Sequence, residues 1–397
     1  MLKIIPAIFK THVIDPLAAL LHDSRSIGII LLSCTAISLL VTNTTTGENY
    51  LSFWQTEIPF FHTLLLPHSF LHFINDGFMA VFFFLAGMEI KREMTEGELS
   101  SVKKAALPVV AAIGGMVIPA VIYYIFNAGT PAQHGWGIPM ATDIAFALGV
   151  TSLLGNKVPV SLKIFLTALA IIDDLGAILV IAFFYGGSIN LVYLAGCAII
   201  VLILWVITKS NKSFGTIHFV LGLLLWFCMF NSGIHATVAG VIFAFFVPVP
   251  YLKQFENRLH PIVYFIIMPI FALANTAIAF PAHGIKQIGN NVSLGIIAGL
   301  FIGKPLGICT ACYILIKKKL AEFPSGTNWK HIIGAGLLAG IGFTMSIFIS
   351  SLAFTDAAVQ NNAKIAVLIA SLLSITAGFT WLKCTNKKNK IAKDVLT

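Results

Sequence analysis

Twelve apolar stretches run along this chain, and most have the length that a membrane-crossing helix requires, roughly 20 residues. They fall at about 26–43, 72–92, 105–126, 137–154, 161–185, 189–208, 214–231, 233–247, 260–280, 292–316, 330–353 and 362–382. Of the 397 residues, 58% are hydrophobic and only 10% are charged, whereas about 25% of a typical soluble domain is charged. Because no soluble fold could hide so much apolar surface, we expect one all-α integral membrane domain over residues 1–397.

Lysine and arginine alternate along the chain with the apolar stretches. All but three of the 25 lie at the chain ends or in every second connection. Such residues accumulate on the cytoplasmic side of a membrane, so we expect both termini in the cytoplasm. Residues 1–25 carry a pattern that predicts an amphipathic segment on the cytoplasmic membrane surface, and residues 383–397 form a basic cytoplasmic tail. The same asymmetry accounts for the net charge of +9, so nucleic acid is not an expected partner.

The three exceptions differ from one another. Lys286 falls between apolar stretches and Lys364 at the very start of the last one, and we assign both to connections on the opposite side of the membrane. Lys304 has no connection to occupy, because it lies about twelve residues inside the stretch 292–316. A charge near the bilayer centre costs a few kcal/mol or more, so such a residue is a functional candidate by default.

Four acidic residues also lie within the apolar stretches: Asp76, Asp143, Asp173 and Asp174. A salt bridge to Lys304 could tie two helices together, and Asp143 could neutralise a helix end. Adjacent helical residues point about 100° apart, however, so Asp173 and Asp174 cannot share one partner neatly. One lysine cannot neutralise three central acids, so at least one carboxylate needs a proton or a metal cation.

The chemistry of such a carboxylate predicts ion exchange. Removal from water and a like-charged neighbour both favour the protonated form of a carboxyl group, so it can titrate near neutral pH. An ionised carboxylate is also a hard oxygen ligand suited to sodium or lithium. One carboxylate can hold a proton or a cation but not both. Alternating exposure of the site to the two sides of the membrane therefore exchanges one ion for the other.

Helix-breaking residues interrupt two of the apolar stretches. Pro139 lies four residues before Asp143, and the stretch 330–353 contains four closely spaced glycines. Interrupted helices at membrane depth occur where the backbone lines a polar cavity, and their ends can be neutralised by charged side chains. Close helix packing is the alternative explanation for the glycines.

Six segments between residues 74 and 354 carry the most specific motifs: INDGFMAVFFFLAGMEIKRE, IPMATDIAFALGV, LKIFLTALAIIDDLGAI, GIHATVAGV, IGKPLGI and GIGFTMSIFISSLAF. In this order they resemble the NhaA-type sodium/proton antiporters of bacteria. That family is itself a standard example of inverted repeats and broken helices. The resemblance implies an all-α membrane protein with twelve transmembrane helices and inverted-topology repeats. Helices 4 and 11 would be broken and would cross at the midplane of the bacterial inner membrane.

The resemblance also implies a function and a set of site residues. The function is electrogenic exchange of cytoplasmic sodium or lithium for external protons, with activation at alkaline pH. Asp174 would be the principal binding site for the cation and the proton. Asp173 would lie beside it and pair with Lys304, and the two aspartates would be the sodium ligands. Thr142 and Asp143 would lie at the broken stretch of helix 4, where Asp143 compensates the helix-end dipoles.

Further residues are implied at the two ends of the transport path. Asp76 would line the external funnel. Five residues on the cytoplasmic side would form a pH-regulatory cluster: Glu89, Arg92 and Glu93 at the end of helix 2, and Glu256 and His260 at the start of helix 9. His235 matches a family histidine linked to the pH response, although an interhelical hydrogen bond explains it equally well. Asn257 stands where the family often has histidine, which leaves the pH profile open.

Three other functions were weighed against antiport. A carrier of an organic solute would need additional polar groups for its substrate. An intramembrane aspartyl protease needs aspartates in YD and GxGD settings, whereas Asp143 follows threonine and no GxGD occurs. A passive channel would not need a buried lysine among the acids. We expect no enzymatic activity and no cofactor, and the assembly is open between a monomer and a homodimer.

Overall fold

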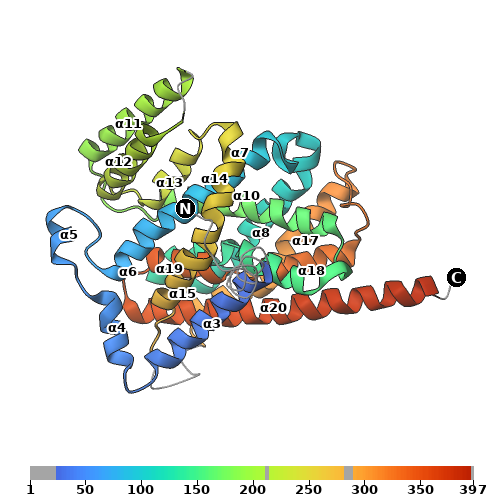
Figure 1. Cartoon of the computed structure of the whole chain (residues 1–397). Coiled ribbons are helices and arrows are strands. Elements are labelled where there is room, and N and C mark those ends of the chain that lie inside the picture. Colours follow the sequence, from blue (N-terminus) through green and yellow to red (C-terminus); the bar gives the residue numbers. More distant parts are fainter. Residues whose placement is uncertain (1–23, 211–213, 281–288, 395–397) are drawn as a thin grey trace, which may run out of the picture.

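The described part of the chain, residues 24–210, 214–280 and 289–394, is built from helices in this computed structural model (Figure 1). An isolated bridge between Glu57 and Ser69 is the only β pairing among these residues. The expectation of an all-α protein is therefore confirmed. The amphipathic segment expected at 1–25 lies outside the described residues except for its last two.

Eight helices in the described part are long and apolar enough to cross a membrane. Five of them are uninterrupted: α3 (Ser24–Thr42), α8 (Val102–Asn127), α10 (Val160–Phe184), α11 (Leu191–Lys209) and α20 (Ala357–Asp394). Three are made of two α-helices joined by a π-helical turn: α6 (Phe70–Phe73) with α7 (Met79–Thr95), α14 (Val249–Ile262) with α15 (Met268–Asn275), and α16 (Asn291–Ala298) with α17 (Lys304–Lys317). Asp76 lies within the first of these turns, and Lys304 directly follows the third.

Two further candidate spans are bent, which brings the number of candidate spans in the described part to ten when each bent pair counts as one. The first joins a 3-10 helix (Pro131–Met140) to α9 (Ile144–Leu153) with an angle of 41°, and the second joins α18 (Trp329–Ala339) to α19 (Phe343–Ala353) with an angle of 45°. The two interruptions predicted from Pro139 and from the glycines are therefore present. At Gly340 a Cβ atom would lie 2.5 Å from the main-chain oxygen of Leu300, so close packing also requires a glycine there.

The remaining helices are short. The ranges 214–231 and 233–247 hold α12 (Thr216–Ser232) and α13 (Thr237–Ala244). The eight residues of α13 rise only about 12 Å, well below the roughly 30 Å of the hydrocarbon core. The connection between the first two spans holds α4 (Gly47–Gln55) and α5 (Pro59–Thr63).

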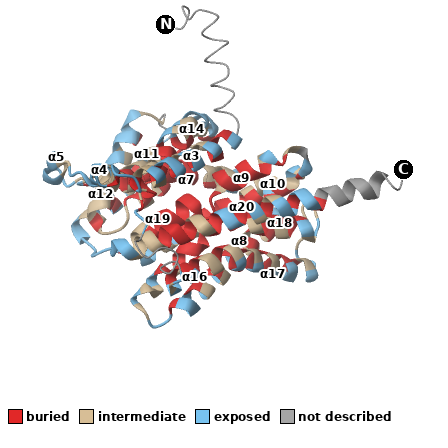
Figure 2. Cartoon of the chain, turned by 90° about the horizontal axis from the view of Figure 1, so that it is seen from below, coloured by how far each residue is buried: buried red, intermediate tan, exposed pale blue. Residues whose placement is uncertain are grey.

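Helix α10 lies at the centre of the molecule and α11 at its edge. Two thirds of the apolar window of α10 is buried (67%), against 17% for α11. Figure 1 shows α11 and α12 as a hairpin at one side of the molecule, and in Figure 2 the buried residues gather on the central helices. The exposed face of α11 suits contact with lipid, whereas charges on α10 are enclosed by protein.

Two placements made from the sequence are wrong. Lys364 does not lie in a connection, because α20 already begins at Ala357, where Asp356 accepts hydrogen bonds from the main-chain N–H groups of Ala358 and Val359. The lysine is buried within the helix, with 6% of its surface exposed. Glu256 and His260 do not begin their helix either, because α14 starts at Val249.

Candidate functional site

A buried ion pair joins α10 to α17 at the centre of the molecule. Lys304 Nζ lies 2.5 Å from Asp173 Oδ2, and neither side chain is exposed. Lys304 also donates to the Thr142 hydroxyl over 2.6 Å and to the main-chain oxygen of Met140. The ammonium group therefore has three oxygen partners, which compensate for its loss of water.

Thr142 links this ion pair to both broken helices. Its hydroxyl lies 2.6 Å from Asp173 Oδ2 and 3.0 Å from the main-chain oxygen of Ala339, at the end of α18. Thr142 itself belongs to the extended residues between the 3-10 helix and α9. The helix break thus brings a hydroxyl and free main-chain carbonyl groups, of Met140 and Ala339, to the ion pair.

Asp174 has no such partners. It is buried, with 5% of its surface exposed, and its Oδ1 accepts no hydrogen bond from the described residues. Asp173 Oδ1 is likewise unpaired within the described part. A buried carboxylate without a partner is costly unless it binds a proton or a cation. The adjacent acids therefore differ in their partners: Asp173 is paired with a lysine, whereas Asp174 Oδ1 can accept a proton or a cation.

Asp143 joins the ends of the two broken helices. As the N-cap of α9 it accepts from the Phe146 N–H over 3.2 Å, and its Oδ2 accepts from both the N–H (3.1 Å) and the hydroxyl of Thr344 in α19. Its own N–H donates to the main-chain oxygen of Ile341 over 2.6 Å. One carboxylate thus neutralises two helix N-termini, where the helix dipole favours negative charge.

Two contributors were not singled out from the sequence, Thr344 and Ser346. The Ser346 hydroxyl donates over 2.7 Å to the main-chain oxygen of Ile138, which the break leaves without a helical partner. Both hydroxyls belong to the GFTMS motif directly after the glycines. A polar residue one turn after a predicted helix break was the available signal.

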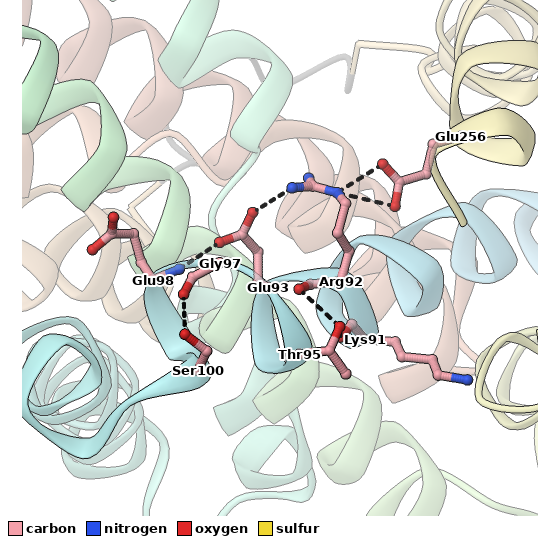
Figure 3. Close-up of polar contacts among 8 residues, drawn as sticks. All are labelled: Lys91, Arg92, Glu93, Thr95, Gly97, Glu98, Ser100 and Glu256. Carbon is pink, nitrogen blue, oxygen red and sulfur yellow. Dashed lines mark hydrogen bonds and ion pairs between the residues drawn. The ribbon is translucent and has the colours of Figure 1, made fainter. Parts of the chain in front are cut away.

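A second charged cluster lies where α7 ends (Figure 3). Arg92 Nε lies 2.9 Å from Glu256 Oε2 on α14, and Arg92 Nη1 lies 2.8 Å from Glu93 Oε1. The other oxygen of Glu93 accepts from the main-chain N–H of Glu98 over 3.1 Å. One guanidinium therefore bridges two carboxylates from two different helices.

Glu89 and His260 lie beside this cluster. With Arg92 they line a small cavity of about 120 Å³, and the His260 ring packs against Tyr264 at 4.3 Å between centroids, tilted by 49°. Ile171 also lines the cavity, three residues before Asp174 and thus one helical turn away. The cavity therefore points from the Arg92 cluster toward the buried acids.

His235 is separate from this cluster. Its Nε2 lies 2.5 Å from the main-chain oxygen of Tyr185, directly after α10. Glu93 and Lys163 line one pocket near the start of α10. At 1.5 Å per residue, Lys163 and Tyr185 are about 33 Å apart. His235 and the Arg92 cluster thus lie at opposite ends of α10, and His235 does make the interhelical hydrogen bond considered above.

Asp76 is not part of the central ion pair. It is 8% exposed, and its Oδ2 lies 3.0 Å from Nε2 of His72, one turn earlier in the chain. Its main-chain oxygen accepts from the Trp226 indole N–H on α12 over 2.9 Å. The π-helical turn that contains Asp76 thus contacts α12 through this oxygen.

A bundle of apolar helices that encloses charges at its breaks defines a multi-pass membrane transporter. The profile of the family described as Na+/H+ antiporter 1 matches residues 18–382. The chain belongs to this family, and the resemblance noted from its motifs is confirmed.

Several named relatives match over nearly the whole chain. The Na(+)/H(+) antiporter NhaA of Cytophaga hutchinsonii is 45% identical over 384 residues, which cover 94% of this chain and 97% of that protein. The Na(+)/H(+) antiporter NhaA 2 of Flavobacterium johnsoniae is 49% identical, with 93% and 92% covered. The Na(+)/H(+) antiporter NhaA 1 of Clostridium beijerinckii is 47% identical, with 96% and 98% covered.

Proposed function

We propose that this chain exchanges cytoplasmic sodium or lithium for external protons across the bacterial inner membrane, with more than one proton per cation. The observation that carries the proposal is the unequal pair of acids on α10. Lys304 neutralises Asp173, whereas Asp174 is buried beside it without a cationic partner among the described residues. Membership in the sodium/proton antiporter family supports the same function.

In the proposed mechanism, Asp174 binds either a proton or the cation. Asp173 and the Thr142 oxygen are close enough to each other to complete the set of hard oxygen ligands that sodium prefers. Because the Asp174 carboxylate holds a proton or a cation but not both, exposure of Asp174 to one side at a time exchanges one ion for the other. Exchange of more than one proton requires a second proton-binding group, and the Asp173–Lys304 pair is the nearest one. Two protons against one monovalent cation would move net charge, which makes the exchange electrogenic.

The proposed topology has twelve membrane segments, inverted repeats and both termini in the cytoplasm. Helices α12 and α13 would be the two segments beyond the ten candidate spans, with the short α13 only partly crossing the hydrocarbon core. Two sets of helices support the repeats. One set comprises α8, the bent pair that contains α9, and α10; the other comprises α16–α17, the bent pair α18–α19, and α20. In each set a bent span lies between two spans that are not bent. Asp143 would compensate the helix ends where the two bent spans meet.

The proposed regulatory group is the cluster Glu89, Arg92, Glu93, Glu256 and His260, and it would activate exchange at alkaline pH. Its support is the cavity that leads from Glu89 and His260 toward α10. Protonation changes in this cluster would alter the charge at the cytoplasmic entrance. His235 is proposed as a separate pH-responsive residue at the other end of α10, and Asp76 as part of the external funnel.

The test uses everted membrane vesicles, whose lumen corresponds to the external side. Respiration acidifies the lumen, and added sodium should dissipate the pH gradient as it enters in exchange for protons. Lithium should act similarly and potassium much less. Asp174→Asn should abolish the response, because an amide can hold neither the proton nor the charge of the carboxylate.

The matched control is Glu96→Gln, a change from acid to amide at an exposed position near the end of α7. This variant should exchange at the wild-type rate. Full exchange by Asp174→Asn would show that this residue is not the ion-binding site. The absence of a sodium response in wild-type vesicles would contradict the proposed function.

A further inference from the structure

A line of three titratable side chains leads into the molecule at the external end of the second span. The rings of His68 and His72 are in edge-to-face contact, with centroids 4.6 Å apart. His72 Nε2 then lies 3.0 Å from Asp76 Oδ2, one helical turn further. The His72–Asp76 step is short enough for direct proton transfer, and the two imidazole rings are in contact.

Burial increases along the line. His68 is exposed, the His72 side chain is 35% exposed, and the Asp76 side chain is 11% exposed. The line therefore connects the aqueous surface to a carboxylate inside the protein. A purely structural histidine would need only the contact with Asp76, and it would not need a second imidazole on its water side.

Aromatic residues of α12 hold the inner end of this line in place. Phe230 packs on the His72 ring at 5.6 Å, and Trp226 stacks on Phe230 at 6.2 Å. Trp226 also donates to the main-chain oxygen of Asp76 over 2.9 Å. The imidazole and the carboxylate are thus positioned by one neighbouring helix, which suits a fixed transfer geometry.

We propose that His68 and His72 collect external protons and deliver them to Asp76, as the external proton entrance of the antiporter. This inference rests on the proposed function and topology. Imidazole takes up and releases protons near neutral pH, which neither a carboxylate in water nor a lysine does. The step is a proton transfer from imidazolium to the Asp76 carboxylate, after which the neutral imidazole takes the next proton from solvent.

The need for such an entrance follows from proton concentration. With an encounter limit of about 10⁹–10¹⁰ M⁻¹ s⁻¹, free protons at about pH 8 reach one site only roughly 10–100 times per second. That rate lies within the ordinary range of turnover numbers of enzymes, about 1–10³ s⁻¹. Proton capture can therefore limit exchange at alkaline external pH, where an exposed imidazole that also accepts protons from buffer molecules speeds the supply.

Other titratable groups lie on the elements that neighbour these histidines. Helix α4, which packs against α6, carries Glu48 and Tyr50, and Glu57 faces Ser69 across the isolated bridge. Helix α12 carries His218 and Cys228, and α15 carries no titratable side chain. His72 forms an ion pair with Asp76 and with no other acid in the described part of the chain.

The experiment uses right-side-out vesicles loaded with radioactive sodium, with the lumen strongly buffered and the external medium weakly buffered. Sodium efflux is measured as the external pH is varied. The efflux rate of His72→Gln should equal that of wild type at about pH 6 and be about threefold or more lower at about pH 8.5. His68→Gln should show a smaller decrease. External imidazole buffer should restore the lost rate, because a mobile imidazole replaces the missing one.

The control is His62→Gln, which removes an exposed histidine of α5 outside this line and should leave the whole pH profile unchanged. A His72→Gln rate equal to wild type at every pH would overturn the proposal. So would a loss that is independent of external pH and not rescued by imidazole, since that pattern indicates a structural role. If wild type shows no proton-coupled sodium efflux, the proposed function fails, and this inference fails with it.

Discussion

Lys304 and Asp173 form an ion pair that is completely enclosed by protein, with 2.5 Å between Nζ and Oδ2 and no exposure of either side chain. Thr142 contacts the same carboxylate oxygen over 2.6 Å. The single buried lysine of the centre is therefore engaged by one of the two adjacent acids. In the proposed mechanism, Asp174 is the carboxylate whose charge the transported ions balance.

Lys304→Met should strongly destabilise the protein. The change leaves Asp173 as a buried charge without its cation, and the loss of one partner of a buried pair costs about 3–5 kcal/mol. The measurement is thermal unfolding of the detergent-solubilised protein. Adding Asp173→Asn to the same chain should restore part of the lost stability. Additive losses in the double variant would show that the two residues do not interact.

Gly307→Ala should also destabilise the protein, through contact between α8 and α17. A Cβ atom at Gly307 would lie 2.0 Å from the main-chain oxygen of Gly114. The helices must separate to admit it, at about 1–3 kcal/mol, and Lys304 begins the helix that moves. Thermal unfolding and sodium exchange should both decline. In the control, Gly28→Ala, the new methyl group meets only Phe146 at 3.8 Å, so unchanged stability is expected.

Thr344→Val tests how the two broken helices are joined. Valine keeps the shape but removes the hydroxyl that donates to Asp143, so the free energy of unfolding should fall by about 1–2 kcal/mol. Asp143→Ala should cost more, because it removes the acceptor for both helix N-termini at once. Equal effects of the two changes would mean that the caps on α9 and α19 are not shared through this carboxylate.

The sequence was sufficient to predict the membrane class, the family and both helix breaks. Apolar length, the proline near Asp143 and the clustered glycines are local signals, and the glycines serve both the helix break and close packing. The partner of Lys304, in contrast, is not determined by a local signal in the sequence. Periodicity alone leaves Asp173 and Asp174 as alternatives, because the choice depends on how α10 is rotated against α17.

The misplacement of Lys364 has a similar cause. Residues 360–364 are polar enough to look like a connection, but Asp356 starts the helix before them, and neighbouring helices cover the lysine. Thr344 and Ser346 went unnoticed because hydroxyl residues are common in membrane helices. Their partners, Asp143 and the Ile138 carbonyl, come from a segment some 200 residues earlier, so only the crossing of the two breaks identifies them.

Arg92→Gln should move the activation of exchange to higher pH. The guanidinium lies 2.9 Å from the Glu256 carboxylate and stabilises its ionised form. Without this guanidinium, Glu256 loses its proton only at a higher pH, and the proposed activation follows that loss. The measurement is sodium-dependent proton exchange in everted vesicles as a function of pH. Lys91→Gln is the matched control, because Lys91 donates to the main-chain oxygens of Phe245 and Val247 and to no carboxylate in the described chain. If the pH profile of exchange shifts equally in both variants, or in neither, activation does not depend on the Arg92 cluster.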